Sequence, residues 1–269
     1  MSVTKDLIQQ LEQRRNAKIL TLIYSDGAFM DDRDVDLVYE MLEDLCEGEK
    51  VEKIEVILSS LGGEISAAVG LVKTIRRYCD KFNVLIPRRA KSGASLLALG
   101  ADKIYMGKIS ELGPIDPIVS HPMMPVMIPA RCPVYFIEKV LPKVAEMGVE
   151  EYFLKVDYSH VAFCIMAAEQ GREYARRLLT TYHFKGQANK LRQVDDIVKK
   201  LTEYPSHDFV IDIDEAKALG LNVEELSIND WVIIYSLYRE YKKKLDGVAL
   251  IIETTKDIRE VKRPKLTLW

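Results

Sequence analysis

The sequence predicts an α/β domain built of repeated βαβ units, followed by a helical C-terminal part. Short apolar segments bounded by charged or turn residues alternate with amphipathic segments of about 10–15 residues, a pattern typical of parallel strands joined by helices. The chain has 269 residues, 48% of them hydrophobic and 29% charged. This is an ordinary globular composition, and a chain of this length can bury a large core around one sheet.

The first half of the chain supplies the alternating elements. The polar segment before residue 18 is expected to form a helix. Strands are expected at 18–24, 51–58, 82–86 and 103–106, and helices at 31–46, 64–78 and 92–100. Each strand is short and apolar, and the longer helices carry apolar residues at helical spacing. Right-handed crossovers between these strands predict a parallel sheet.

The second half is expected to be mainly helical. Helices are predicted over most of 138–202 and at 214–219 and 228–244, with strands at 208–213 and 248–253 and a charged, peripheral tail. We expect an α/β domain over residues 1–225. The remainder, 226–269, is expected to be an extension of one helix and one strand that packs on the same domain.

Composition argues against several classes of function. The net charge of −3 disfavours binding of nucleic acid through a broad basic face. No apolar run approaches the roughly 18–20 residues that span a bilayer, and the polar N-terminus does not resemble a signal peptide. The four cysteines lie far apart and form no CxxC pair. We therefore expect a cytoplasmic protein with no metal, no nucleic-acid partner and no membrane span.

The segment 114–133 differs from its surroundings. It contains six of the ten prolines and three methionines. Prolines at this density exclude a regular helix or a central strand. Long irregular segments of compact domains are often lids or binding loops, but a connection wrapped over the surface would have the same composition. Both interpretations stay open.

A Gly-Gly turn joins the second predicted strand to the following helix. Residues 59–64 read SSLGGE, and Gly62 and Gly63 allow positive φ and a close approach of backbone N–H groups to a ligand. At a helix N-terminus such groups stabilise a phosphate or the oxyanion of an acyl-transfer intermediate. The sequence matches neither a P-loop nor a GxGxxG fingerprint. The structural alternative is a tight turn that merely needs glycine.

Ser92 is the first candidate nucleophile. It follows the third predicted strand and opens a helix of small residues, where the helix dipole favours negative charge. A serine at a helix start is also a common N-cap, which is the structural alternative. Ser95, in the same helix, is a second candidate.

Together these two sites resemble those of the ClpP/crotonase-type serine peptidases. That group includes the Clp protease proteolytic subunit, signal peptide peptidase A and, most similar to this chain, the serine dehydrogenase proteinase family. The matching segments are SSLGGEISAAVGLVKTIRRY, AKSGASLLALGADKIYM with the following SELGPIDPIV, and SHDFVIDIDEAKALGLNV. The family's serine falls on Ser92, its Ala-Asp pair on Ala101 and Asp102, and its Leu-Gly-Pro stretch on 112–117. The resemblance covers residues 17–118 and 195–225, a little under half of the chain.

The resemblance implies a ClpP/crotonase-like fold and a serine hydrolase, most similar to the peptidases. Ser92 would attack a carbonyl, and the backbone of Gly62, Gly63 and Gly93 would form the oxyanion hole. The family needs no cofactor. It implies a peptide or protein substrate and a homo-oligomer that is a trimer, a hexamer or larger.

Three kinds of general base stay open, because a serine hydroxyl needs a neighbour to take its proton. In the Clp protease subunit a histidine follows the serine by about 25 residues, and an aspartate precedes a Glu-Ala pair by about seven. Counting back from Glu215 gives Asp208, and His207 stands beside it. The histidine's expected place holds Asp116, interpreted as an active-site wall or partner, and the nearest histidine is His121.

A lysine is the third kind of base. Signal peptide peptidase A uses a lysine about 50 residues after its serine, and Lys143 lies in that range. Lys91 is adjacent to Ser92, but neighbouring side chains at a helix start generally diverge. The other two histidines, His160 and His183, match no motif and are expected to be structural.

Two rival functions stand beside the serine hydrolase. A crotonase-like acyl-CoA enzyme shares the fold and the oxyanion hole but uses no serine at this position. A catalytically inactive relative would act as a scaffold or binding protein. Replacing Ser92 by alanine distinguishes the three, since only a serine hydrolase would lose both activity and labelling by a fluorophosphonate probe.

Overall fold

The computed structural model describes residues 2–121, 124, 126–148 and 157–263. It is a mixed α/β structure, 50% helical and 21% strand, with one large sheet, and it confirms the predicted fold class. The sheet has seven strands in the order β11-β10-β1-β2-β3-β5-β9. Five strands run parallel: β1 (Lys18–Tyr24), β2 (Val51–Ser59), β3 (Cys79–Ile86), β5 (Lys103–Met106) and β9 (Val223–Glu225). The two remaining strands, β10 (Leu250–Glu253) and β11 (Ile258–Val261), add an antiparallel edge next to β1.

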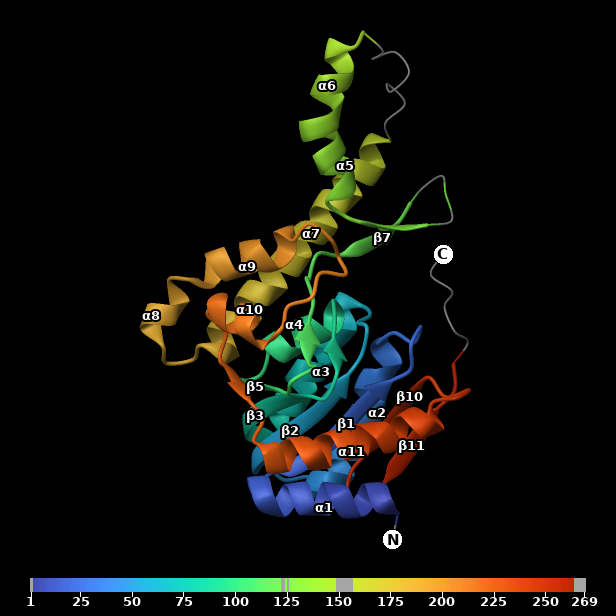
Figure 1. The fold of residues 1–269 in the computed structure, drawn as a ribbon, viewed down its shortest axis with the longest axis vertical. Coiled ribbons are helices and arrows are strands. Elements are labelled where there is room, and N and C mark those ends of the chain that lie inside the picture. Colours follow the sequence, from blue (N-terminus) through green and yellow to red (C-terminus); the bar gives the residue numbers. More distant parts are fainter. Residues whose placement is uncertain (1, 122–123, 125, 149–156, 264–269) are drawn as a thin grey trace.

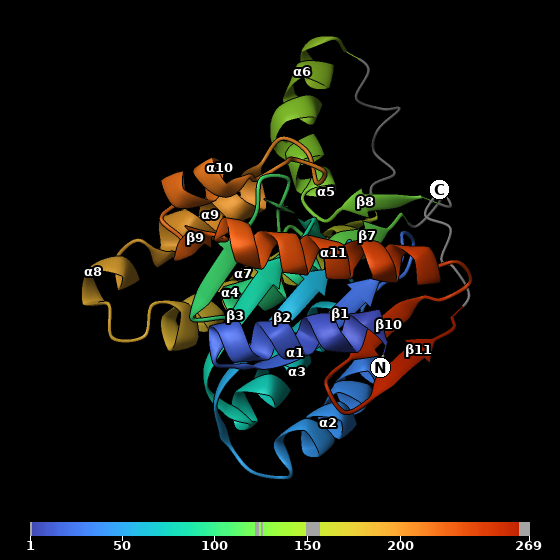
Figure 2. The same cartoon turned by 60° about the horizontal axis from the view of Figure 1, so that its bottom comes forward.

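Helices cover both faces of this sheet (Figure 2). One face carries α1 (Val3–Arg15) and α11 (Ile228–Lys244). The other carries α2 (Asp32–Cys46), α3 (Ile65–Arg77) and α4 (Gly93–Leu99). Ile19 and Ile23 of β1 pack in the first layer, whereas Leu20 and Leu22 pack in the second. Because both faces are buried, the strands read as nearly continuous apolar runs.

The helical region forms a second part of the molecule. It contains α7 (Tyr158–Leu178), the π-helical turn η3 (Leu179–His183), α8 (Ala188–Leu191), α9 (Val194–Glu203) and α10 (Ile213–Ala218). An arm made of α5 (Cys132–Tyr135), η1 (Phe136–Val140) and α6 (Leu141–Glu146) projects away from the sheet, at the end opposite α1 (Figure 1).

The proline-rich segment forms a short hairpin rather than a helix or a central strand. Its strands are β7 (Ile118–Ser120) and β8 (Met127–Pro129), which pair with each other and not with the large sheet. Residues 113–117, which precede the hairpin, are buried. Three residues of the segment, 122, 123 and 125, lie outside the described residues. The lid and the surface connection stay the two predictions for this segment.

Two sequence expectations fail, one for the strand at 208–213 and one for the C-terminal tail. The strand expected at 208–213 is absent from the described structure except for a single antiparallel bridge between Ile211 and Leu112. Phe209 and Val210 are exposed, because no further strand lies beside them to cover their alternating apolar side chains. The tail is also not peripheral, since β11 joins the sheet and the Arg263 side chain is buried against α2.

The C-terminal stretch packs on the same sheet as the rest of the chain. Helix α11 contributes to the core layer that also contains α1, and β10 pairs with β1. A division of the chain near residue 225 stays a prediction. Among the described helices, none combines the length and the apolar character that crossing a membrane requires.

Candidate active site

The candidate site lies at the carboxyl ends of parallel strands, the usual position for ligand sites in α/β sheets. β2 ends at Ser59, directly before the Gly-Gly turn. The chain leaving β3 forms β4 (Arg89–Ala90) and then enters α4. Ser60 pairs with Ala90, with hydrogen bonds from Ser60 N to Arg89 O (2.8 Å) and from Lys91 N to Ser60 O (3.0 Å). This pairing brings the glycine turn beside the start of α4.

The two glycines of the turn are required by their surroundings. Gly62 and Gly63 have φ values of +113° and +154°, a backbone region that residues other than glycine rarely adopt. A Cβ on Gly62 would lie 2.8 Å from Ser92 Cβ, and a Cβ on Gly63 would lie 2.2 Å from Met30 O. The turn is therefore held between Met30 on one side and Ser92 on the other.

Ser92 has an unusual backbone conformation for a residue with a side chain. Its φ of +50° and ψ of −121° are of a kind that costs about 1–3 kcal/mol and is concentrated at functional sites. Ser92 stands at the N-cap position of α4, yet within the described structure its hydroxyl makes no capping hydrogen bond. The N-cap alternative therefore does not account for this serine. The conformation is like that of a nucleophile at a sharp strand-to-helix turn.

Ser95 is bonded in a way that suits a structural residue. Its buried hydroxyl donates to Ala90 O (2.6 Å) and accepts from Gly113 N (2.9 Å). These bonds tie α4 to β4 and to the segment after β6 (Glu111–Leu112). The two serines thus have different environments, because the part of the chain that the structure describes offers the Ser92 hydroxyl no hydrogen-bond partner.

The backbone N–H groups of the glycine turn and of the start of α4 lie close to one another. The Gly62 N–H donates to Ser60 Oγ (3.0 Å) and is engaged. Among the described residues, neither the Gly63 N–H nor the Gly93 N–H has a hydrogen-bond partner. The two backbones are in close contact, since a Cβ on Gly93 would lie 3.1 Å from Gly63 N. Two unpaired donors therefore lie next to Ser92.

His207 and Asp116 form a hydrogen-bonded pair. His207 Nδ1 lies 2.9 Å from Asp116 Oδ1, and both side chains are largely buried. The pairing follows from one antiparallel bridge, in which Leu112 N donates to Ile211 O (2.9 Å) and Ile211 N donates to Leu112 O (3.1 Å). Asp116 follows Leu112 by four residues and His207 precedes Ile211 by four, so the two side chains meet on the same side of the bridge.

Lys91 connects Ser92 to the chain segments that carry this pair. Its Nζ donates to Leu112 O and Phe209 O, each at 3.1 Å, and lies 3.7 Å from Glu111 Oε1. Burial lowers the pKa of Lys91, although the nearby Glu111 carboxylate opposes this shift. The ammonium group is therefore turned toward the two segments that carry Asp116 and His207.

The remaining predicted residues are placed differently. Asp208, expected to support His207, is exposed, and the carboxylate that bonds His207 is that of Asp116. His121 follows β7 in the hairpin, where its ring lies 6.4 Å from that of His160. Lys143 is exposed on α6, within the projecting arm (Figure 1). The described residues contain no hydrogen bond between the Ser92 hydroxyl and His207, a contact that often tightens only when substrate binds.

Arg131 belongs to the site, although no sequence motif predicts it. Arg131 Nε lies 3.6 Å from Asp116 Oδ2, the oxygen that His207 does not contact. That oxygen is buried, and the described structure provides it with no hydrogen bond. Arg131 stands near the end of the proline-rich segment and outside every motif matched in the sequence.

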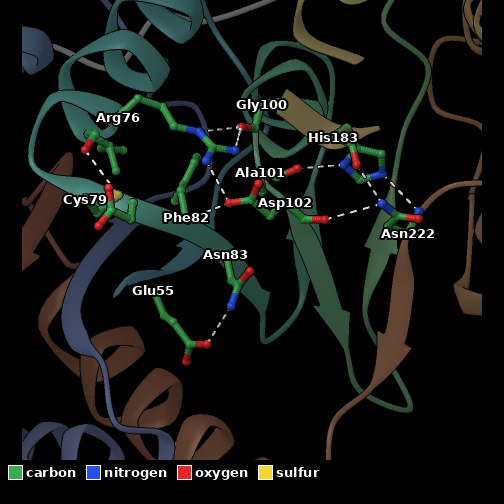
Figure 3. A network of polar contacts seen from close by, with 12 residues as sticks. Glu55, Arg76, Cys79, Phe82, Asn83, Gly100, Ala101, Asp102, His183 and Asn222 are labelled. Atoms are coloured by element: carbon green, nitrogen blue, oxygen red, sulfur yellow. Dashed lines mark hydrogen bonds and ion pairs between the residues drawn. The ribbon is translucent and has the colours of Figure 1, made fainter. Parts of the chain in front are cut away.

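The far end of α4 is fixed by a polar network (Figure 3). His183 Nδ1 lies 2.7 Å from Ala101 O, and Asn222 N donates to His183 Nε2 (2.9 Å). Because Nε2 accepts, the proton of the neutral ring is on Nδ1. Burial lowers the pKa of His183 to about 4. The motif residue Asp102 accepts from the Arg76 guanidinium (2.7 Å), and Arg76 also donates to Gly100 O, so the Ala-Asp pair is structural.

The described residues contain no group of three or more His, Cys, Asp or Glu side chains that could hold a metal ion. The fold and the site define a ClpP-like α/β protein, in which a serine in a strained conformation lies beside a glycine turn. The chain belongs to the family of ClpP-like SDH-type serine proteinases, whose sequence model matches residues 1–262.

Two relatives from the archaeon Methanocaldococcus jannaschii are similar over most of the chain. The uncharacterized protein MJ0137 is 26% identical over 247 residues, which cover 87% of this chain and 78% of the relative. The uncharacterized protein MJ1495 is 26% identical over 227 residues, which cover 80% of this chain and 70% of the relative.

Proposed function

We propose that the protein is a serine hydrolase that acts on peptides, with Ser92 as the nucleophile. The observation that carries the proposal is the conformation of Ser92, strained and without a capping bond, against the glycine turn. A strained residue persists only where the surrounding structure holds it, and such residues are concentrated at functional sites. Membership in a family of serine proteinases supports the same assignment.

His207 is the proposed general base, and Asp116 is its orienting partner. The contact between His207 Nδ1 and the Asp116 carboxylate favours the tautomer with the proton on Nδ1. Nε2 is then free to take the proton of the Ser92 hydroxyl and to return it to the leaving amine. The buried carboxylate stabilises the imidazolium that forms in between. This assignment gives Asp116 the role that sequence spacing had suggested for Asp208.

The N–H groups of Gly63 and Gly93 are the proposed oxyanion donors. Each of them is unpaired within the described part of the chain, whereas the Gly62 N–H is used by Ser60. In other serine hydrolases, one such donor contributes about 3 kcal/mol to the stability of the tetrahedral intermediate. The Gly62 contribution is then indirect, since its lack of a side chain lets the turn approach Ser92.

A peptide or protein substrate, assembly into a homo-oligomer and the absence of a cofactor are proposed on the family resemblance. The cytoplasmic location is proposed on the composition of the chain. An inactive scaffold is the second candidate function. It is favoured by one observation, the lack of a hydrogen bond between Ser92 and His207 among the described residues.

Labelling with a fluorophosphonate probe tests the proposal. The wild type is expected to gain one covalent phosphonate, detected by intact mass. Ser92→Ala should gain none, whereas Ser120→Ala, which removes an exposed hydroxyl of β7, should be labelled like the wild type. A wild type that gains no label, or a Ser92→Ala variant that is labelled normally, contradicts the proposal.

A further inference from the structure

The backbone of Met30 forms one wall of the glycine turn. Met30 and Gly63 pair as a parallel bridge, in which Met30 N donates to Gly62 O and Glu64 N donates to Met30 O, each at 2.9 Å. The contact leaves no room for a side chain at Gly63, where a Cβ would lie 2.2 Å from Met30 O. Any displacement of Met30 is therefore transmitted to the N–H of Gly63.

Met30 directly precedes a buried charge cluster at the start of α2. Asp31 is the N-cap of this helix, and its N–H donates to Asp34 Oδ2 (3.0 Å) in a capping box. The Asp34 side chain is fully buried and also accepts from Tyr24 Oη (2.9 Å). Burial and the Asp34 charge raise the pKa of Tyr24 well above its ordinary value, so this hydroxyl stays a donor.

Arg263, near the end of the described chain, supplies the cation for this cluster. Its guanidinium donates to Asp34 Oδ1 (2.5 Å) and Oδ2 (3.2 Å), and it lies 3.2 Å from Asp31 Oδ2. It is the one basic side chain that the described residues bring into ion-pair contact with Asp34. A bidentate guanidinium–carboxylate contact of this kind combines a defined geometry with a favourable charge interaction.

Arg263 therefore contacts both Asp31, which directly follows Met30, and Asp34, which accepts a hydrogen bond from the Asp31 N–H. Without Arg263, Asp34 would be a buried carboxylate with no cation, which is a strongly unfavourable state. The start of α2 can relieve it by moving toward water. Because Asp31 is adjacent to Met30, such a movement also displaces the backbone that is paired with Gly63.

We propose that Arg263 is a positioning residue for the oxyanion-binding turn, acting through Asp34 and Met30. The inference rests on the proposed function, since the N–H that it positions is the proposed Gly63 donor. Arg263 and Asp34 are 229 residues apart in the sequence, and the antiparallel β10–β11 edge brings them together.

Arg259 provides a matched control for the test. It belongs to β11, in the same C-terminal hairpin, and its guanidinium bonds Glu40 of α2 and Asp257. Replacing it weakens the contact between the hairpin and α2 but leaves Asp34 and its cation in place. Any effect that comes only from loosening the C-terminal hairpin should therefore appear in Arg259→Ala as well.

The first measurement is steady-state hydrolysis of a peptide ester. Arg263→Ala is expected to lower kcat about 10-fold with KM within about twofold, since a donor displaced by a fraction of an ångström acts mainly on the transition state. Arg263→Lys, which keeps the charge but not the bidentate geometry, should show a smaller loss of kcat. Arg259→Ala should stay within about twofold of the wild type. A rise in KM with unchanged kcat, or equal losses in Arg263→Ala and Arg259→Ala, overturns the proposal.

The second measurement is amide hydrogen exchange at Met30 and Glu64, which does not require activity. Both N–H groups should exchange faster in Arg263→Ala than in the wild type, and Arg259→Ala should leave them unchanged. Unchanged exchange in Arg263→Ala overturns the inference. If the wild type shows no turnover, the proposed function fails, whereas the exchange result still decides whether Arg263 holds the turn. Should Arg263→Ala not fold, Arg263→Lys is compared with the wild type in both measurements.

Discussion

Asp116 and His207 stand 91 residues apart in the chain and are joined by a hydrogen bond of 2.9 Å. The bond exists because Leu112 and Ile211 pair as a single antiparallel bridge between the two segments. Lys91, adjacent to Ser92, contacts the carbonyl oxygens of both segments. The candidate nucleophile and the histidine–aspartate pair are thus connected through this bridge and the side-chain hydrogen bonds of Lys91.

Replacing Asp116 by asparagine should reduce kcat for ester hydrolysis by roughly 10³–10⁴-fold. The amide would favour the wrong tautomer of His207 and could not stabilise its cation, as in other serine hydrolases. Asp208→Asn is the matched control, because this exposed carboxylate does not bond His207 in the structure. It should stay within about threefold of the wild type. An Asp208→Asn defect as large as that of Asp116→Asn would contradict the proposed pair.

Replacing Gly63 by alanine should abolish fluorophosphonate labelling and lower the stability of the fold. The new methyl group would overlap the Met30 backbone, and φ of +154° would be strained. Gly247→Ala is the control, since Gly247 also has positive φ but has no atom within 4 Å of the added Cβ. This control should lose only about 1 kcal/mol of unfolding free energy and keep normal labelling. Normal labelling of Gly63→Ala would argue against the oxyanion role of the turn.

Replacing Lys91 by methionine should lower kcat by about 10–100-fold without abolishing it. The substitution removes the contacts that hold Ser92 to the segments of His207 and Asp116, and misplaced catalytic groups cost rate rather than binding. If Lys91 were itself the general base, the variant would be as inactive as Ser92→Ala. Comparison of the two variants in the same hydrolysis assay distinguishes a positioning role from a catalytic one.

The stability of the protein should fall in mild acid because of His183. Its folded-state pKa is lowered from 6.5 to about 4 by burial. The unfolded chain therefore binds a proton at this residue below about pH 6.5, while the folded protein does not. The contribution of His183 is fully present above pH 6.5 and is lost progressively toward pH 4, by up to about 3 kcal/mol.

The measurement is urea unfolding at several pH values, for the wild type and for His183→Gln. The variant should be less stable at pH 7, because the buried hydrogen bonds to Ala101 and Asn222 are disturbed. Its stability should nevertheless decline less steeply between pH 6.5 and pH 4. Parallel pH profiles for the two proteins would show that His183 does not titrate as described.

Much of the fold could be predicted because its signals are local. The strand expected at 18–24 matches β1, and the helix expected at 228–244 matches α11. Both have an apolar pattern that runs from one end of the element to the other. The segment 208–213 has a similar alternation, but the chain supplies no neighbouring strand for it beyond Leu112. Pattern alone cannot reveal whether a partner is present.

Some residues of the candidate site could be predicted from local sequence, and others could not. Ser92 and the two glycines could be located from the sequence because a strand, a turn and a helix are contiguous there. The partner of His207 could not, since it depends on pairing between segments 91 residues apart. Spacing drew attention to Asp116 as a wall or partner but selected Asp208 as the supporting carboxylate. Arg263 had no signal, because a charged residue in a charged tail resembles a solvated one.

The most direct test of Ser92 as the nucleophile and His207 as its base is the rate at which a fluorophosphonate labels Ser92, with the modified residue identified by peptide mass spectrometry. Label is expected on Ser92 in the wild type, with a rate at least about 100-fold lower in His207→Ala and near wild-type rates in His121→Ala and Lys143→Ala. Absence of label on wild-type Ser92, or a rate that falls in His121→Ala and not in His207→Ala, would contradict these roles.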